Sequence, residues 1–411
     1  MPAAIASYPI TTATTTLAHK NLVAPSLLAS NPTISLSNAY APKSLPIDSH
    51  LHSHSIHSQS LPTTHDLAGP ITDALLSLLR MLWGWIASMS MAILLKLIRL
   101  GPIPKHVAFI MDGNRRFAKK RGLEVSKGHA EGADTLEETL DWCLKLGVKT
   151  VTVYAFSTEN FSRNKEKEVD PIMKISTEKF QKFATHSELV KKHDIAVRVH
   201  GRLNLLPEPV LKAAHLATKM TCKNSNATLN ICMPYTSREE IAFAVKTLVR
   251  GVEDGVLEVD DIGEEVLEQC FWTGGLGRGV GEQEGVGGGD LDILVRTSGE
   301  VRLSDYMLWQ ASSSCQIHFL SVYWPDFTFW HMLPALLQYQ SNYLSLSKAR
   351  REHQKRAGFM LNKDINISNS NTKASSKQLD YEKMQLRVKR VREFLESVRE
   401  QRLAEATAHA E

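Results

Sequence analysis

The strongest constraint on the fold is an alternation between short apolar runs and longer helical patterns, which extends over residues 101–345 of the 411-residue chain. Short apolar runs bounded by turn-forming residues are typical of buried strands, and repeated strand–helix alternation predicts an α/β fold with a mostly parallel central sheet surrounded by helices. The predicted strands are residues 106–111, 149–155, 194–200, 227–232, 292–295 and 316–320. The predicted helices are residues 129–146, 170–192, 207–222, 237–252, 260–271 and 303–312.

Three further segments flank or interrupt this region. Residues 1–68 are rich in Ser, Thr, Pro, Ala and His and carry few charges, which predicts a disordered low-complexity region. Residues 346–411 are predicted as a charged helical C-terminal extension, whose apolar stripe suits a partner helix, the flank of its own domain, or a solvated helix. Residues 273–289 are rich in Gly, but no strand leads into them, so we expect a surface loop and not a phosphate-binding loop.

An uncharged apolar stretch, residues 81–95, precedes the first predicted strand. It is shorter than the roughly 20 apolar residues that a membrane span needs. Trp83 and Trp85 suit a membrane interface, and the flanking cations can reach the headgroups. We therefore predict that residues 71–100 form an apolar, membrane-associated helix that lies in or dips into the bilayer. A helix buried against the protein's own core and a single full span are the alternatives.

A charged cluster, Asp112-Gly113-Asn114-Arg115-Arg116, follows the first predicted strand directly. Ligands of open α/β sheets bind just beyond the carboxyl ends of the strands. A carboxylate can hold Mg²⁺, and each guanidinium can donate two parallel hydrogen bonds to phosphate oxygens. The cluster therefore predicts a site for a metal-complexed polyphosphate.

Two other predicted strands, residues 149–155 and 292–295, also run into polar clusters. Arginines with small hydroxyl and amide side chains at a strand end suit an anion, and Ser304 is placed to cap a following helix, whose N-terminus would add to the site. Three such clusters at strand ends predict one composite site and not unrelated surface ion pairs. The candidate residues of these two clusters are Ser157, Asn160, Arg163, Arg296, Arg302 and Ser304.

Composition and missing motifs exclude several other classes of protein. The net charge of +4 permits an anionic ligand but does not require nucleic acid. The five Cys residues include no CxxC pair, which argues against a zinc site and for a reducing compartment. The chain has no Walker A, Rossmann glycine, GxSxG, HExxH or DDxxD motif. We therefore expect electrostatic catalysis on bound diphosphates and not a covalent nucleophile.

The candidate residues lie in longer blocks that closely resemble the cis-prenyltransferases, the undecaprenyl diphosphate synthase family. The resemblance covers roughly residues 100–345. The blocks DGNRR, YTSREEI, LWQASSSC and YWPDFTFW are similar to those of one branch of this family, the catalytic subunits of eukaryotic dehydrodolichyl diphosphate synthase. The family blocks are HVAFIMDGNRRFAKKRG with GH at 128–129, TVYAFSTENFSR at 152–163, RTSGEVRLSDYMLWQ at 296–310 and WPDF at 324–327.

The resemblance implies a reaction in which successive isopentenyl diphosphates extend farnesyl diphosphate, each adding a cis double bond. The product would be a dehydrodolichyl (polyprenyl) diphosphate for dolichol synthesis and protein glycosylation. Asp112 is implied as the Mg²⁺ ligand and, with Asn160, as a catalytic residue. The implied substrate-binding residues are Gly113, Asn114, Arg115, Arg116, His129, Ser157, Arg163, Arg296, Arg302 and Ser304.

The resemblance also implies a partner subunit. Single-chain members of the family end the domain with an Arg-x-Gly motif, which here occurs only as Arg356-Ala357-Gly358, further along the chain than the family position. Eukaryotic catalytic subunits take this motif from a non-catalytic, Nogo-B-receptor-like subunit, at the endoplasmic reticulum membrane with the catalytic domain facing the cytosol. Two alternatives stay open: a homodimeric single-chain synthase that uses Arg356-Ala357-Gly358, and a non-catalytic partner subunit of the same fold.

Overall fold

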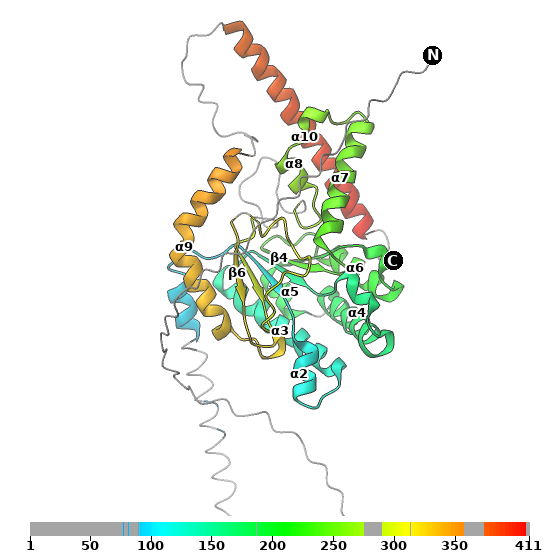
Figure 1. The fold of residues 1–411 in the computed structure, drawn as a ribbon, viewed down its shortest axis with the longest axis vertical. Coiled ribbons are helices and arrows are strands. Elements are labelled where there is room, and N and C mark those ends of the chain that lie inside the picture. Colours follow the sequence, from blue (N-terminus) through cyan, green and yellow to red (C-terminus); the bar gives the residue numbers. More distant parts are fainter. Residues whose placement is uncertain are drawn as a thin grey trace, which may run out of the picture. The chain divides into compact units, whose positions relative to one another are not determined.

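A central sheet lies among the helices (Figure 1). It has six strands in the order β3–β4–β2–β1–β5–β6, and every neighbouring pair is parallel. All six predicted strands are present, and with them the predicted α/β fold class is confirmed. The strands are β1 (His106–Ile110), β2 (Thr150–Tyr154), β3 (Ile195–His200), β4 (Ala227–Cys232), β5 (Ile293–Arg296) and β6 (Gln316–Phe319).

The computed structural model describes residues 77, 81, 89, 91–185, 187–274, 290–312, 314–356 and 374–407. All of them belong to one compact unit, residues 72–411. Three predicted features lie wholly or largely outside the described residues. These are the low-complexity region 1–68, the first two-thirds of the apolar segment 71–100, and the Gly-rich insert beyond residue 274.

Helices connect the strands and cover the sheet. The α-helices are α2 (Asn114–Lys120), α3 (Val125–Leu146), α4 (Asp170–Thr185), α5 (Glu188–His193), α6 (Glu208–Thr221), α7 (Ser237–Glu253), α8 (Glu264–Gln269), α9 (Phe329–Arg356) and α10 (Ala374–Thr407). Short 3₁₀ helices are η1 (Thr158–Ser162), η3 (Leu203–Leu205), η4 (Val259–Asp261) and η5 (Trp324–Asp326). The remaining helix, η2 (Lys165–Val169), is a π-helical turn that leads into α4.

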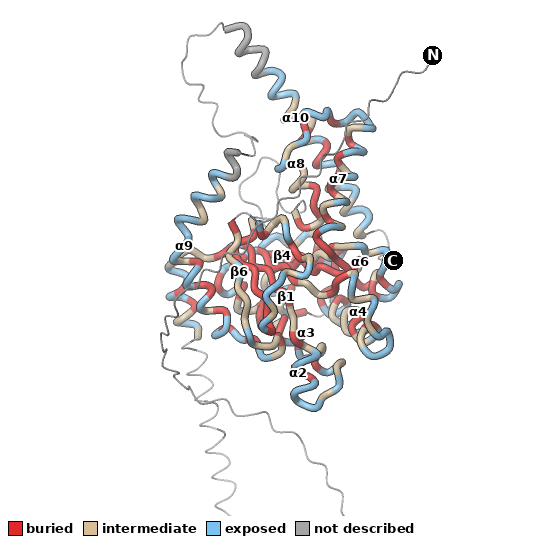
Figure 2. The backbone as a smooth tube through the Cα atoms, viewed as in Figure 1, coloured by how far each residue is buried: buried red, intermediate tan, exposed pale blue. Residues whose placement is uncertain are grey.

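β1 is buried over its whole length (Figure 2). Its apolar side chains alternate between two cores. Val107 and Phe109 belong to the core that α3, α4, α6 and α9 share. Ala108 and Ile110 face the opposite way and pack with a second core that includes Met307. Because successive side chains of a strand point to opposite faces of the sheet, a near-continuous apolar strand is what a sheet covered on both faces requires.

Two predicted helices are each divided in two. The helix predicted over residues 170–192 ends at Thr185 as α4, and α5 follows it because Ser187 caps the new helix. The Oγ atom of Ser187 accepts a hydrogen bond from the backbone N–H of Val190 at 3.2 Å, which satisfies one of the free donors of a helix start. The helix predicted over residues 260–271 consists of η4 and α8, separated near Gly263.

The helix predicted over residues 303–312 is wrong. The segment is a series of turns in which Ser304, Asp305 and Met307 have φ angles of 50°, 57° and 46°. A right-handed helix needs φ near −63°, so Ser304 is not a helix N-cap. The apolar spacing that suggested a helix has another cause, since Tyr306 and Met307 fill the second core beneath the turn.

The C-terminal helix α10 packs against its own domain. Val391, Phe394, Leu395 and Val398 are buried in a core that they share with residues of α7 and α8. The sequence left three roles open for the apolar stripe on this helix. These four residues have the second role, because they pack against the flank of their own domain. The fully buried carboxylate of Asp261 reinforces the contact, because Arg390 of α10 donates to it at 2.6 and 2.9 Å.

The described end of the apolar segment packs against the α/β domain with one side only. Residues 91–98 are helical, and Leu95 and Ile98 are buried in the main core. The opposite side is open to solvent, with Ile93 53% and Leu97 58% exposed. Among the residues that the structure describes, no helix is both long and apolar enough to cross a membrane.

Candidate active site

The candidate site lies at the point in the sheet from which the chain adds strands on opposite sides. From β1 the chain continues to β2 on one side, whereas from β5 it continues to β6 on the other, and β1 and β5 are neighbours. Ligands of open α/β sheets bind at such a switch point, beyond the carboxyl ends of the strands. The register pairs Ile110 with Arg296, so the clusters that follow β1 and β5 reach the same crevice.

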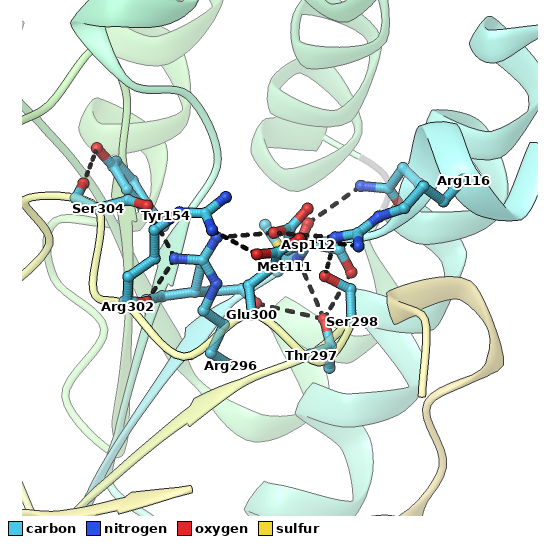
Figure 3. Close-up of polar contacts among 12 residues, drawn as sticks. Met111, Asp112, Arg116, Tyr154, Arg296, Thr297, Ser298, Glu300, Arg302 and Ser304 are labelled. Atoms are coloured by element: carbon cyan, nitrogen blue, oxygen red, sulfur yellow. Dashed lines mark hydrogen bonds and ion pairs between the residues drawn. The ribbon is translucent and has the colours of Figure 1, made fainter. Parts of the chain in front are cut away.

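The two clusters are joined by an ion pair between Asp112 and Arg296 (Figure 3). A terminal nitrogen of Arg296 lies 2.8 Å from Oδ2 of Asp112. Thr297 locks the backbone beside it, since its hydroxyl donates to the Asp112 carbonyl at 2.7 Å and accepts from the Asp112 N–H at 3.1 Å. Burial acts to raise the pKa of Asp112, but the hydrogen bond and charge of Arg296 hold that pKa below its ordinary value. The carboxylate is therefore ionised at neutral pH.

Gly113 and Asn114 form the tight turn from β1 into α2. Gly113 has a φ of 107°, and a Cβ atom there would lie 2.9 Å from the Tyr323 ring, so only glycine fits without strain. The side-chain nitrogen of Asn114 donates to the Met111 carbonyl at 3.2 Å. Its Oδ1 atom is buried and has no hydrogen-bond partner among the described residues. This oxygen lies against Gly132 of α3, where a Cβ atom would be only 2.3 Å from it.

The arginines of the first cluster differ in their partners. Arg115 lies 3.2 Å from a carboxylate oxygen of Glu168. Arg116 contacts Glu300 at 2.9 Å and also hydrogen-bonds the hydroxyl of Ser298. Both side chains remain about half exposed, at 51% and 42%, so an anion in the crevice can reach them.

His129, on the first turn and a half of α3, faces this cationic group. Burial and then the charges of Arg163 and Arg115 lower the pKa of His129 to about 4. Its Nε2 atom is buried without a hydrogen-bond partner among the described residues. The imidazole is therefore neutral at physiological pH, and its ring lines the same cavity as the arginines.

The third cluster forms a short helix, η1, at the end of β2. Ser157 caps it by accepting from the N–H of Glu159 at 3.2 Å, and Oδ1 of Asn160 accepts from the N–H of Ser157 at 3.4 Å. This reciprocal capping fixes both side chains at the strand end. Arg163, directly after η1, is half-buried, and burial together with the charge of Arg115 lowers its pKa. An anion between these two cations would relieve their repulsion.

The cluster after β5 is organised around Arg296, whose side chain is only 4% exposed. One terminal nitrogen of Arg296 donates to the Arg302 carbonyl at 2.5 Å and to Oγ of Ser304 at 2.8 Å. The Arg302 side chain is 61% exposed, and its guanidinium forms an ion pair with Glu300. Glu300 therefore bridges Arg302 and Arg116, one arginine from each diphosphate-type cluster (Figure 3).

All of the clusters open into one cavity of about 740 Å³. Every predicted site residue lines it, so the structure brings all twelve together. The deeper wall is apolar and comes from the sheet and from α3 and α4, which suits a hydrocarbon chain. The lining residues of this wall include Leu136, Val153, Ile172, Ile175, Phe180, Phe183, Ile231 and Met233.

The donor atoms around Asp112 limit how the predicted metal ion could be held there. No group of three or more His, Cys, Asp or Glu side chains in the described part of the chain could hold a metal ion unaided. Mg²⁺ is commonly held by one or two carboxylates together with substrate phosphates and water. A single ionised carboxylate facing a crevice lined by phosphate-binding side chains fits that arrangement.

Sequence reasoning did not single out several residues that organise the site. Glu300 bridges two arginines, Thr297 locks the Asp112 backbone, and Tyr154 donates to the Ser304 carbonyl at 3.2 Å. Glu300 and Thr297 lie inside the cluster after β5, so a search for carboxylates and hydroxyls among its arginines could have found them. The role of Tyr154 depends on a contact 150 residues away and has no local signal.

We predict that an anion in the cavity raises the pKa of His129 from about 4 toward its ordinary value of about 6.5. Inorganic diphosphate would offset the charges of Arg115 and Arg163, which disfavour the protonated ring. NMR titration of the histidine rings checks this, with His129→Gln assigning the signal. His200 is the control, because its pKa is also about 4 but it is fully buried against Asn230. A His129 pKa that diphosphate leaves unchanged would contradict the prediction.

Comparison with known proteins agrees with this geometry. Residues 110–346 match the model of the family described as "Putative undecaprenyl diphosphate synthase". This range includes all three strand-end clusters and the apolar wall of the cavity. The match therefore covers more than half of the chain, including the whole candidate site.

Several curated proteins are similar over the same region. The Dehydrodolichyl diphosphate synthase complex subunit DHDDS of Homo sapiens is 46% identical over 254 residues, 62% of this chain and 72% of that protein. The corresponding complex subunit of Schizosaccharomyces pombe is 41% identical over 62% of this chain and 92% of that protein. A tritrans,polycis-undecaprenyl-diphosphate synthase of Pyrococcus abyssi is 44% identical over 57% of this chain and 83% of that protein.

A solved structure shares the fold. Lavandulyl diphosphate synthase from Lavandula x intermedia, in complex with dimethylallyl diphosphate, superposes with a TM-score of 0.50 at 31% sequence identity. The superposition covers 58% of this chain and 95% of that chain. With the family match, the relatives and the parallel six-stranded sheet, the chain belongs to the cis-prenyltransferases, a family of transferases.

Proposed function

We propose that this chain is the catalytic subunit of a long-chain cis-prenyltransferase that makes dehydrodolichyl diphosphate for dolichol synthesis and protein glycosylation. Farnesyl diphosphate would be extended by successive isopentenyl diphosphates. In each cycle the isopentenyl alkene attacks the allylic carbon, the bond from that carbon to its diphosphate breaks, and inorganic diphosphate and a proton leave. The observation that carries the proposal is one cavity with two cationic clusters at its mouth and an apolar wall behind them.

The cluster after β1 suits the allylic diphosphate. Arg115 and Arg116 can both reach an anion in the crevice, and the neutral ring of His129 lines the same cavity. The turn at Gly113 brings backbone close to the same point without a side chain in the way. These groups would stabilise the charge that gathers on the departing diphosphate in the transition state.

Asp112 would hold Mg²⁺ in this half of the site. The bound ion would neutralise charge on the leaving diphosphate. Arg296 orients the carboxylate, since it contacts Oδ2 of Asp112 at 2.8 Å and keeps it ionised. Asp112 therefore has the charge and the fixed direction that such a role requires.

The cluster after β5 suits isopentenyl diphosphate, with Arg302 and Ser304 at the cavity surface and Arg296 behind them. Ser157 and Asn160, which belong to the cluster after β2, line the same cavity. We assign Asn160 to positioning the reacting groups. Its amide is fixed by the η1 cap, so it can hold the isopentenyl group at a defined distance from the allylic carbon.

The first prediction from this assignment concerns Asp112. Asp112→Ala should lower turnover at least about a hundredfold, because charge on the departing diphosphate loses its stabilisation. The measurement is radiolabelled isopentenyl extension of farnesyl diphosphate with excess Mg²⁺, followed by product sizing. Asp141→Ala, which removes an exposed carboxylate paired with Lys145 on α3, is the matched control. Near-normal turnover of Asp112→Ala would refute the metal assignment. Failure of the wild-type complex to extend farnesyl diphosphate would refute the proposed function.

We further propose a non-catalytic, Nogo-B-receptor-like partner subunit, in keeping with relatives that are named as complex subunits. The proposed contact surface is the open edge strand β6 with α9 beside it. Gln316 of β6 donates to a carbonyl of α9 at 3.4 Å, so the two elements are adjacent. Ile317 is 38% exposed, and Trp330 and Leu337, two helical turns apart on α9, are 55% and 51% exposed. Exposed apolar residues beside an unpaired strand edge are typical of a protein interface.

Trp330→Glu should weaken assembly with the partner at least about tenfold, because a charge would have to be buried in an apolar contact. Co-purification of the two full-length subunits, with light scattering, measures this. Leu386→Glu on α10 is the matched control, since Leu386 is also exposed, at 62%. Robust extension by the catalytic chain without any partner would contradict the heteromer and favour a homodimeric synthase.

We also propose that residues 71–100 bind the endoplasmic reticulum membrane with the catalytic domain on the cytosolic side. The described part supports this because its outward side is apolar, with Ile93, Leu97 and Leu100 exposed at 53%, 58% and 84%. Lys96 and Arg99 are exposed on the same segment and can meet anionic headgroups. An insoluble polyprenyl product gives such contact a purpose.

Replacing Ile93, Leu97 and Leu100 together by Ser should reduce binding to anionic lipid vesicles at least about tenfold. Co-sedimentation of the full chain with vesicles checks this. Folding should be unaffected, because these side chains do not enter the core, whereas Leu95→Ser should lower the melting temperature. Unchanged sedimentation of the triple variant would refute membrane binding through this face. Replacement is a cleaner test than deletion of residues 71–100, which would also remove the buried Leu95 and Ile98.

A further inference from the structure

The turn that carries Arg302 and Ser304 has an unusual backbone. Ser304, Asp305 and Met307 have φ angles of 50°, 57° and 46°. This left-handed region is unfavourable for side chains other than glycine, although asparagine and aspartate tolerate it best. Such a conformation persists only where surrounding contacts determine it. The contacts that hold this turn therefore fix the positions of Ser304 and Arg302.

The start of α7 holds the turn from one side. The N–H of Ser237 donates to the Asp305 carbonyl at 2.7 Å, and the N–H of Arg238 donates to Oδ1 of Asp305 at 3.2 Å. The Arg238 side chain adds a 2.7 Å hydrogen bond to Oδ2. A carboxylate at the N-terminus of a 17-residue helix accepts donors that have no partner within the helix, and it also meets the positive end of the helix dipole.

Aromatic packing supports the turn from beneath. The Tyr306 ring is fully buried and stacks on Tyr154 of β2, with ring centres 4.5 Å apart and planes 12° from parallel. The Tyr154 hydroxyl lies between two carbonyl acceptors, that of Ser304 at 3.2 Å (Figure 3) and that of Tyr235 at 3.1 Å. This packing does not use the Asp305 carboxylate, so the fold beneath the turn can survive its loss.

We infer that Asp305 is a positioning residue for the second diphosphate. Arg302 and Ser304 line the cavity, whereas Asp305 is not part of its lining. Its carboxylate, seated on α7 and Arg238, fixes the left-handed turn so that Ser304 meets Arg296 at 2.8 Å and presents a preformed anion site. The inference rests on the proposed function, since it assigns the turn to isopentenyl diphosphate.

Steady-state kinetics of the full-length chain with its partner subunit test the inference. Asp305→Ala and Asp305→Gly should each raise the KM for isopentenyl diphosphate at least about tenfold, with the KM for farnesyl diphosphate and the melting temperature little changed. Asp305→Asn should recover most of the loss, because asparagine tolerates the left-handed region and its side-chain oxygen can still accept from the Arg238 N–H. Calorimetric titration with isopentenyl diphosphate should show the same order of affinities.

Arg238→Ala should act in the same direction with a smaller effect, because the backbone donors of α7 remain. Arg202→Ala is its matched control. Arg202 also forms an ion pair at the start of α7, with Glu239 at 3.3 Å, but it does not contact the left-handed turn that carries Asp305. Normal KM values in Asp305→Gly would overturn the inference by showing that the side chain is dispensable. An equal rise in the KM for isopentenyl diphosphate and in the KM for farnesyl diphosphate would also overturn the inference. These outcomes presuppose an active wild-type complex; its inactivity would instead overturn the proposed function and this inference with it.

Discussion

The site depends on one buried cation, the guanidinium of Arg296. Its side chain is 4% exposed, and it joins the Asp112 carboxylate, the Arg302 carbonyl and the Ser304 hydroxyl. A buried charge is tolerable only when it is paired and hydrogen-bonded, and removing one partner of such a pair costs about 3–5 kcal/mol. The arrangement is available because β1 and β5 are adjacent and Ile110 pairs with Arg296, so one side chain at the end of β5 can reach across to the residue that follows β1.

A second, looser set of ion pairs surrounds this fixed centre. Glu300 bridges Arg116 and Arg302, whose side chains are 42% and 61% exposed. Exposed ion pairs contribute little to stability because water and salt screen them, so an incoming diphosphate can take the place of the carboxylate at small cost. The hydrogen bond and charge of Arg302 also lower the pKa of Glu300, which keeps the bridge charged. The inner pair therefore sets the geometry, while the outer arginines are free to exchange their partners.

The sequence predicts the sheet and the strand-end clusters because both follow from local pattern. Val107 to Ile110 are apolar and end at a charged turn, and the carboxyl ends of parallel strands must meet at one edge. The turn after Arg302 could not be predicted in this way. Its apolar spacing resembles a helix, but Tyr306 and Met307 are apolar because they fill a core, and Asp305 is held by Arg238, which lies 67 residues earlier in the chain. Contacts between residues this far apart in the chain override the local preference for a helix, and they leave no periodic pattern in the sequence.

The separation of polar mouth and apolar wall also fixes the direction of a substrate. Cations gather where strands end, whereas Val153 and Ile231 of the sheet and Phe180 of α4 line the deeper part of the cavity. Under the proposed assignment, a prenyl diphosphate would place its diphosphate at Arg115 and Arg116 and its hydrocarbon chain against the apolar residues. Burying each added five-carbon unit would contribute about 4 kcal/mol at roughly 0.8 kcal/mol per carbon. Each extension would therefore hold the hydrocarbon end more tightly, while the diphosphate end, on exposed arginines, stays exchangeable between cycles.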